Sequence, residues 1–178
     1  IPTPTVSIPS TLKFGSLHTM LPGLTIPHEV DATGGECEHR AHGKGPQPFP
    51  DTPLAFLQLP EFSTMARDAP TPWGYRKVYQ DQHASSVSEK YMTHDTMETY
   101  STHDCAWRCD KVQGCEAFNI FFERTPTLNL GQKCRNTLAS SAIKCALWGS
   151  MLNSSDATDT GYMRFDFQVV VAGSNAYN

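Results

Sequence analysis

Six cysteines constrain the fold of this 178-residue chain more than any other feature. An even number of cysteines is typical of proteins from oxidising compartments, where the thiols pair as disulfides. The chain begins at Ile1 with no charged and apolar leader, which indicates a removed signal peptide or a fragment, the former being the simpler account. We therefore expect a secreted chain with three disulfides among Cys37, Cys105, Cys109, Cys115, Cys134 and Cys145.

Prolines and cysteines are unevenly distributed along the chain. Twelve of the 13 prolines lie at or before Pro72, and five of the six cysteines lie after it. The opening segment, rich in Pro, Ser and Thr, favours polyproline II and suits O-glycosylation, although a plain linker fits it equally well. We expect residues 1–50 to form an extended Pro/Gly-rich arm and residues 51–178 to form the folded domain.

The domain begins with a helical pattern. Thr52 can cap a helix that starts at Pro53, where proline loses no hydrogen bond. Pro60 then predicts a break or kink. The apolar face of this broken helix would consist of Leu54, Phe56, Leu57 and Phe62.

The remaining chain reads as strands with one main helix. Alternating side chains and turn residues predict strands over 75–82, part of 91–100, 115–123, 143–149 and 162–172. Apolar residues occupy both faces of the segment 115–123, which indicates a central strand covered on two sides. Thr102 can cap a helix over 103–112, which Gly114 ends. Cys105 and Cys109 are four residues apart and share one helical face, so strands packed there are their natural disulfide partners.

The stretch CAWRCDKVQGCEAFNIFFER, followed by IKCALWG, resembles the PAN/apple family. The resemblance implies an α+β fold with an antiparallel sheet of about five strands and one helix across it. It also implies disulfides Cys105–Cys145 and Cys109–Cys115, which leaves Cys37 to pair with Cys134. The segments PDTPLAFLQLPEF, APTPWGY and FQVVVAGSNAY extend the likeness to secreted ascomycete apple-like proteins of unestablished function, over roughly residues 50–177.

Three groups of residues have the side-chain types of a metal site or a catalytic site, but their sequence context favours structural roles. Cys37, His39 and His42 have metal-ligand types, but zinc would need a free thiolate and a fourth ligand. Ser101, His103 and Asp104 are too close in sequence to face one another as a triad. Asp156 and Asp159 lie in a polar, turn-like segment rather than an enclosed cleft. We therefore expect no catalytic residue, no metal and no cofactor.

Aromatic residues are the best candidates for a binding site. Trp107 lies two residues from each helical cysteine, so it should point away from them. Trp148 occupies the C-x-x-W strand position of the PAN/apple family, and the resemblance implies that it lies in the core. Further aromatic residues that could line a protein or sugar site are Trp73, Tyr75, Tyr79, Tyr91 and Tyr100.

Charge and hydropathy argue against several classes of binding partner. A net charge of −4 argues against nucleic acid and against electrostatic docking to anionic membranes. No apolar run approaches the roughly 20 residues that span a bilayer. We expect a non-catalytic glycoprotein, with a glycan on Asn153 in the sequon Asn153-Ser154-Ser155, that binds extracellular protein or carbohydrate at a fungal cell surface. The alternative is a wall or matrix component that assembles with itself through strand edges and its arm.

Overall fold

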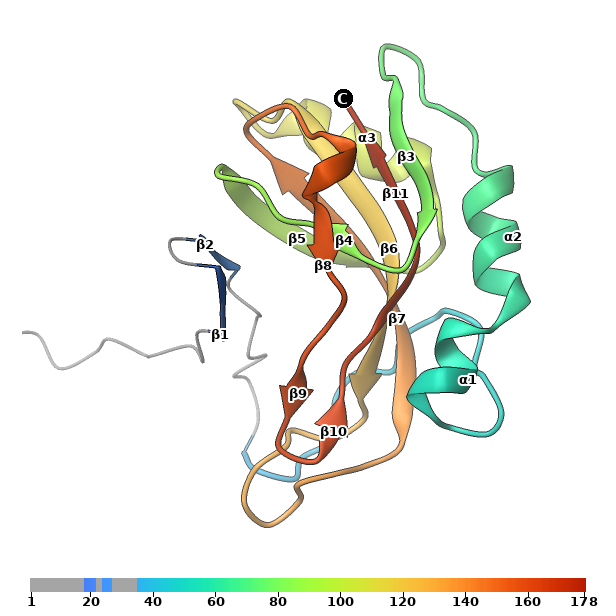
Figure 1. The fold of residues 1–178 in the computed structure, drawn as a ribbon, viewed down its shortest axis with the longest axis vertical. Helices are drawn as coiled ribbons and strands as arrows, with labels where there is room; N and C mark the ends of the chain where they lie inside the picture. The colour runs from blue at the N-terminus through green and yellow to red at the C-terminus, as the bar shows by residue number, and fades with distance from the viewer. Residues whose placement is uncertain (1–17, 22–23, 27–34) are drawn as a thin grey trace, which may run out of the picture. The chain divides into compact units, whose positions relative to one another are not determined.

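A computed structural model describes residues 18–21, 24–26 and 35–178 (Figure 1). Strands β1 (His18–Leu21) and β2 (Leu24–Ile26) form a short antiparallel pair within the segment expected to be an extended arm. The rest of the described chain belongs to one unit, Ala32–Asn178.

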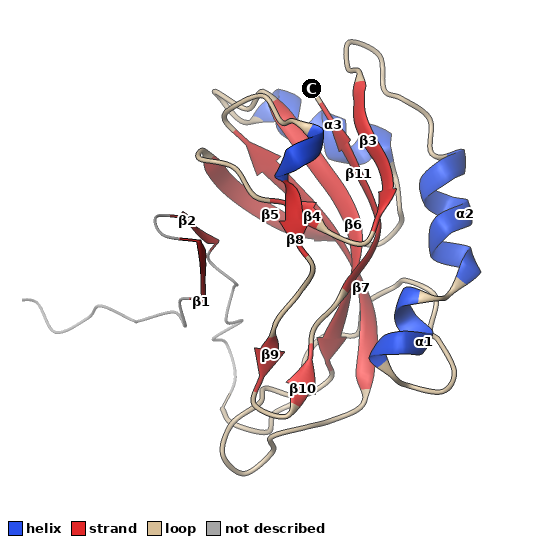
Figure 2. Cartoon of the chain, viewed as in Figure 1, coloured by secondary structure: helices blue, strands red, loops and turns tan. Residues whose placement is uncertain are grey.

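This unit is built on a five-stranded antiparallel sheet (Figure 2), which confirms the α+β prediction. The strand order is β3-β11-β6-β7-β5. The middle position of β6 confirms the central strand expected near residues 115–123. The bounds of the strands are β3 (Lys77–Gln82), β5 (Tyr91–Met97), β6 (Ala117–Pro126), β7 (Ala139–Trp148) and β11 (Val171–Tyr177).

Two short helices precede the sheet. Helix α1 (Pro53–Leu57) begins as predicted, because Thr52 Oγ1 accepts a hydrogen bond from the Ala55 N–H at 3.1 Å. Pro60 does not end a helix but starts a second one, α2 (Pro60–Asp68), because proline fits the first helical turn. Phe56 and Phe62 are buried, whereas the prediction that Leu54 faces the core is wrong, since its side chain is 62% exposed.

Helix α3 (Thr102–Lys111) lies one residue earlier than predicted, and its cap differs. The N-cap is Ser101, whose Oγ accepts from the Asp104 N–H at 3.1 Å. Thr102 is itself helical and donates its hydroxyl to the carbonyl oxygen of Pro70 at 2.7 Å. The sequence contains two adjacent capping residues, and tertiary contact decides between them.

The prediction of one continuous strand over residues 162–172 is wrong. This segment divides into a hairpin of β9 (Met163–Arg164) and β10 (Phe167–Gln168), followed by the separate strand β11. The chain turns at Phe165, which has a φ of 52° and is partly exposed. Elsewhere, β4 (Ser85–Ser86) pairs with β8 (Ala157–Asp159), which follows the short 3-10 helix η1 (Ser154–Asp156).

The main core lies between the helices and one face of β6 and β7. The Phe62 ring of α2 stacks on Phe122 with centroids 4.3 Å apart, and Tyr100 stacks on the same Phe122 ring at 4.8 Å. A second cluster on the opposite face contains Tyr79, Ala117 and Trp148. The sheet is therefore covered on both sides, as the apolar pattern of β6 predicts.

Residues 35–50 belong to the body of the fold rather than to an arm that ends at residue 50. The Cys37 N–H donates to the Asn129 carbonyl at 2.7 Å, and the Gly45 N–H donates to the Ser141 carbonyl at 2.9 Å. The boundary expected at residue 50 therefore falls inside the unit. Proline and glycine made this segment resemble a linker, but its hydrogen-bonding partners lie about 90 residues further along the chain.

Candidate binding surface

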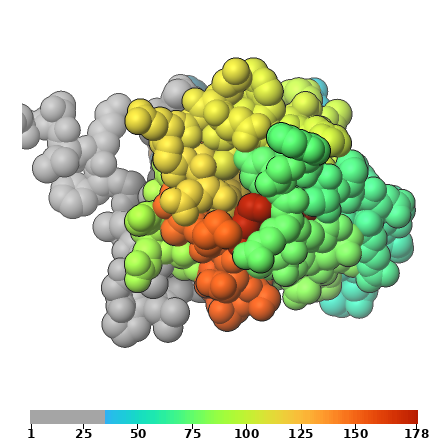
Figure 3. Space-filling model, turned by 90° about the horizontal axis from the view of Figure 1, so that it is seen from above, coloured from blue at the N-terminus to red at the C-terminus, as the bar shows by residue number. Residues whose placement is uncertain are grey.

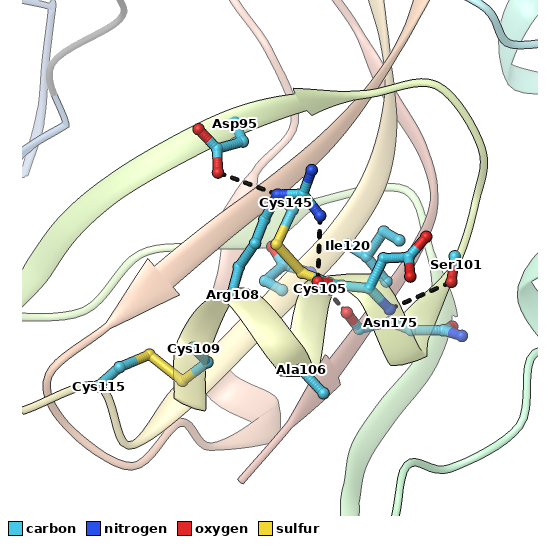
Figure 4. The surroundings of a disulfide bond; sticks show 12 residues. Asp95, Ser101, Cys105, Ala106, Arg108, Cys109, Cys115, Ile120, Cys145 and Asn175 are labelled. Atoms are coloured by element: carbon cyan, nitrogen blue, oxygen red, sulfur yellow. Dashed lines mark hydrogen bonds and ion pairs between the residues drawn. A yellow bond between two sulfur atoms is a disulfide. The ribbon is translucent and has the colours of Figure 1, made fainter. Parts of the chain in front are cut away.

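Helix α3 is fixed to the sheet by two disulfides (Figure 4). Cys105 is bonded to Cys145 of β7, with Cα atoms 5.7 Å apart, and Cys109 to Cys115 just before β6, at 5.3 Å. The third disulfide joins Cys37 to Cys134. These are the three pairs expected from the sequence. Because one disulfide joins α3 to β7 and the other joins the end of α3 to the segment that leads into β6, the helix presents its outer face in one orientation.

Neighbouring elements hold both flanks of α3. On one flank, Arg108 Nε donates to Asp95 Oδ2 of β5 at 3.1 Å. On the other flank lies the turn Pro70–Tyr75, whose Tyr75 hydroxyl donates to Asp110 Oδ1 at 2.8 Å. Burial, reinforced by this hydrogen bond to the carboxylate, raises the pKa of Tyr75 well above its usual range. The turn is therefore attached to the helix at both of its ends, since Thr102 also binds Pro70.

Two tryptophans are exposed on helix α3 and the Pro70–Tyr75 turn. Trp107 of α3 is 59% exposed, which confirms that it points away from the helical cysteines, and Trp148 is 1% exposed, which confirms its place in the core. Trp73 projects from the Pro70–Tyr75 turn and is 96% exposed. Lys111, one helical turn after Trp107, places its Nζ 5.6 Å from the centroid of the indole ring. We call the outer face of α3 together with this turn the α3 surface.

The α3 surface lies at the end of the sheet that also holds the C-terminal residue of the described chain. The backbone of Asn178 exchanges two hydrogen bonds with Arg76, at 2.7 and 3.0 Å, and its side chain exchanges two with the backbone of Leu152, at 2.8 and 2.9 Å. Figure 3 views the molecule from this end, with red C-terminal residues between yellow, green and orange segments of the chain. Three distant parts of the sequence thus meet here.

Four of the residues considered for chemistry make structural contacts. Cys37 is oxidised, and the one cluster of metal-ligand types in the described chain, Glu36 with Cys37 and Cys134, contains both sulfurs of that disulfide. Ser101 caps α3. Asp156 accepts from the Asn153 N–H at 2.8 Å, and the buried Asp159 accepts from the Ser85 hydroxyl at 3.1 Å.

The sequence predicts exposure of Trp107, whereas it marks Trp73 only as one of several aromatic candidates. A local signal for Trp73 exists, because it lies between Pro72 and Gly74 in a turn closed by a 3.2 Å hydrogen bond from the Tyr75 N–H to the Pro72 carbonyl. Gly74 adopts a φ of +84°, which favours glycine. A large aromatic residue in such a turn has little to pack against locally.

A second exposed apolar patch lies beside α1. Asp51 Oδ2 accepts from the Ala139 N–H at 2.8 Å, which joins the segment before α1 to the start of β7 and brings the exposed apolar residues of these two segments near one another. The patch consists of Phe49, Leu54 and Leu138, which are 97%, 62% and 72% exposed. Exposed apolar groups clustered in this way are typical of interaction sites.

Comparison of the chain with protein-family models, with curated proteins and with solved structures gives no match. Within the described residues, every helix is too short or too polar to cross a lipid bilayer.

Proposed function

We propose that this protein is a secreted, non-catalytic module of PAN/apple type that binds an extracellular protein or glycan through the α3 surface. The observation that carries the proposal is the exposure of Trp73 and Trp107 on backbone that disulfides and hydrogen bonds hold in place. Three disulfides in one small unit fit an oxidising, extracellular setting.

Exposed tryptophans on a fixed backbone are well suited to binding. Tryptophan is among the residues that most often dominate binding energy, because one side chain offers a large apolar area and an N–H donor. Binding costs less entropy when the contact residues are already ordered. Since two disulfides fix α3, only the side-chain torsions of Trp107 remain to be ordered.

The surface also carries polar groups that suit a hydroxyl-rich or polar partner. His103, Asp104 and Lys111 are exposed on α3 on the same side as Trp107. Aromatic rings beside such donors and acceptors can stack on the apolar face of a sugar or receive a protein side chain. The resemblance to ascomycete secreted proteins makes fungal wall polysaccharides the first glycans to test.

The experiment measures binding of the full chain to immobilised chitin, β-1,3-glucan and mannan, to a glycan array, and to proteins extracted from the cell surface. We expect Trp73→Ala and Trp107→Ala each to weaken binding about tenfold or more, as for a hot-spot residue. Met163→Ala is the control, because it removes an exposed apolar side chain of β9, which belongs neither to the α3 surface nor to the patch beside α1. Equal binding by the wild type and the double tryptophan variant would contradict the proposal.

The apolar patch beside α1 favours a second candidate, a self-assembling component of a wall or matrix. In that case Phe49, Leu54 and Leu138 would be buried between copies, and the edge strand β5 could extend the sheet. Light scattering during size-exclusion chromatography tests this candidate. We expect association that rises with concentration and is reduced by Leu138→Ser but not by Trp107→Ala. A monomer at all concentrations would eliminate it.

A further inference from the structure

The chain contains a single sequon for N-glycosylation, Asn153-Ser154-Ser155. Neither Ser154 nor the following Asp156 is a proline, so the local sequence has no residue that blocks modification. In the folded protein a glycosylated asparagine must lie at the surface, because the bulky, polar glycan cannot be packed into the core. The structure therefore decides whether this tripeptide is a surface acceptor or part of the core.

Asn153 and both serines of the sequon are exposed. Asn153 has extended backbone angles, φ −122° and ψ 161°, and immediately precedes η1. Its backbone N–H donates to Asp156 Oδ2 at 2.8 Å, and its carbonyl accepts from the Asp156 N–H at 3.0 Å. Asn153 and Asp156 form a capping box, in which the Asn153 side chain accepts from the Asp156 backbone through its carboxamide oxygen. None of these contacts uses the side-chain amide nitrogen, which is the atom that glycosylation modifies.

The neighbouring residue anchors this exposed turn. Leu152 is buried, at 2% exposure, and its backbone is hydrogen-bonded in both directions to the side chain of Asn178. A glycan on Asn153 would therefore extend into solvent from a fixed position without displacing a core side chain. Through Asn178 and Arg76, this position belongs to the same end of the molecule as the turn that carries Trp73.

We propose that Asn153 carries an N-linked glycan. The donor is an oligosaccharide attached to a lipid diphosphate. The amide nitrogen of Asn153 bonds to the anomeric carbon of the sugar and gives up one proton. The bond between that carbon and the diphosphate oxygen breaks, and the lipid diphosphate departs with the bonding electrons. The inference rests on the secretory route in the proposed function, because this donor is used there.

The test is expression of the full chain with a secretion signal in yeast, followed by intact mass measurement before and after treatment with peptide N-glycosidase. We expect one enzyme-sensitive glycan on the wild type, which the enzyme removes to leave aspartate at position 153. Ser155→Ala should abolish it while leaving Asn153 and its backbone bonds in place. Ser155→Thr and the matched control Ser154→Ala should retain it, since both keep a functional sequon.

A correctly disulfide-bonded chain whose mass does not change with the enzyme would overturn the inference, as would an enzyme-sensitive glycan that persists in Ser155→Ala. O-linked sugars on the Ser/Thr-rich opening segment are insensitive to this enzyme and do not count as support. Chain retained inside the cells is measured in the same way. Failure of secretion then bears on the proposed extracellular function, and absence of the glycan bears on Asn153.

Discussion

The ion pair between Asp51 and Arg124 joins the segment before α1 to the sheet, and its burial makes it a sensitive test of the fold. Arg124 Nη2 lies 2.7 Å from Asp51 Oδ1, and the Arg124 side chain is only 6% exposed. The other partners of the guanidinium are neutral: the Gln168 carbonyl at 2.9 Å and the Phe167 ring at 4.3 Å. Asp51→Asn would leave a buried cation without a counter-charge.

Removing one partner of a buried pair typically costs about 3–5 kcal/mol. Asp51 is itself 30% exposed, so water can reach part of the site, and we expect a loss of about 3 kcal/mol in the free energy of unfolding. Asp51→Ala should cost about 1 kcal/mol more, because asparagine keeps one oxygen that can accept from either Arg124 or the Ala139 N–H, whereas alanine leaves both donors without that partner. The assay is urea unfolding followed by tryptophan fluorescence, with the disulfides intact.

Two further variants separate the charge effect from other causes. Asp166→Asn breaks the exposed pair with Arg135, in which the closest atoms are 2.8 Å apart, and should leave the urea midpoint almost unchanged. Adding Arg124→Met to Asp51→Asn should recover much of the loss, because the unpaired cation is gone. If Asp51→Asn were no more destabilising than Asp166→Asn, the assignment of Asp51–Arg124 as a structural ion pair would be refuted.

Three more outcomes follow from the structure. Burial raises the pKa of Tyr79 to about 12, so the hydroxyl of this residue loses its proton at lower pH in the unfolded chain than in the folded one. The free energy of unfolding should therefore fall as pH rises from about 10 to 12. Tyrosinate absorbance of Tyr79 should then increase together with unfolding rather than before it. Gly173→Ala should cost about 1–2 kcal/mol for its φ of +55° and more for contact with the Phe122 ring, whereas Gly114→Ala, with φ +83° and open space, should cost only the backbone part in the same urea assay. Trp73→Ala and Trp107→Ala should change the free energy of unfolding by less than about 0.5 kcal/mol, so a larger loss would mean that these rings support the fold instead of a ligand.

Local patterns in the sequence predicted the elements that depend on neighbouring residues. The four-residue spacing of Cys105 and Cys109 indicated a helix attached to strands, and the structure contains that helix with both bonds. Alternation of apolar residues identified β6 as a strand covered on both faces. Thr52 followed by Pro53 identified the start of α1. Each of these signals rests on backbone geometry within a few residues.

The errors arose where distant contacts outweigh local pattern. Ser101 and Thr102 are both suitable cap residues in the sequence. Ser101 is the cap in the structure, because the Thr102 hydroxyl donates to the carbonyl oxygen of Pro70 instead. The alternation over 162–172 continues through Phe165, yet the chain reverses there to form the β9–β10 hairpin. Residues 35–50 have the composition of a linker, but the backbones of residues 127–129 and 141 supply their hydrogen-bonding partners.

The candidate surface shows the same division. By its spacing alone, the sequence determined that Trp107 turns away from the helical cysteines, because residues two apart lie on opposite sides of a helix. It could not bring Trp73 to that surface, since the turn that carries Trp73 is held by hydrogen bonds to residues 32 to 35 positions away. Nor could it place Asn153 at the same end, which depends on the hydrogen bonds that Asn178 makes to both Leu152 and Arg76. Secondary structure follows from neighbouring residues, whereas a surface assembled from distant segments exists only once the chain has folded.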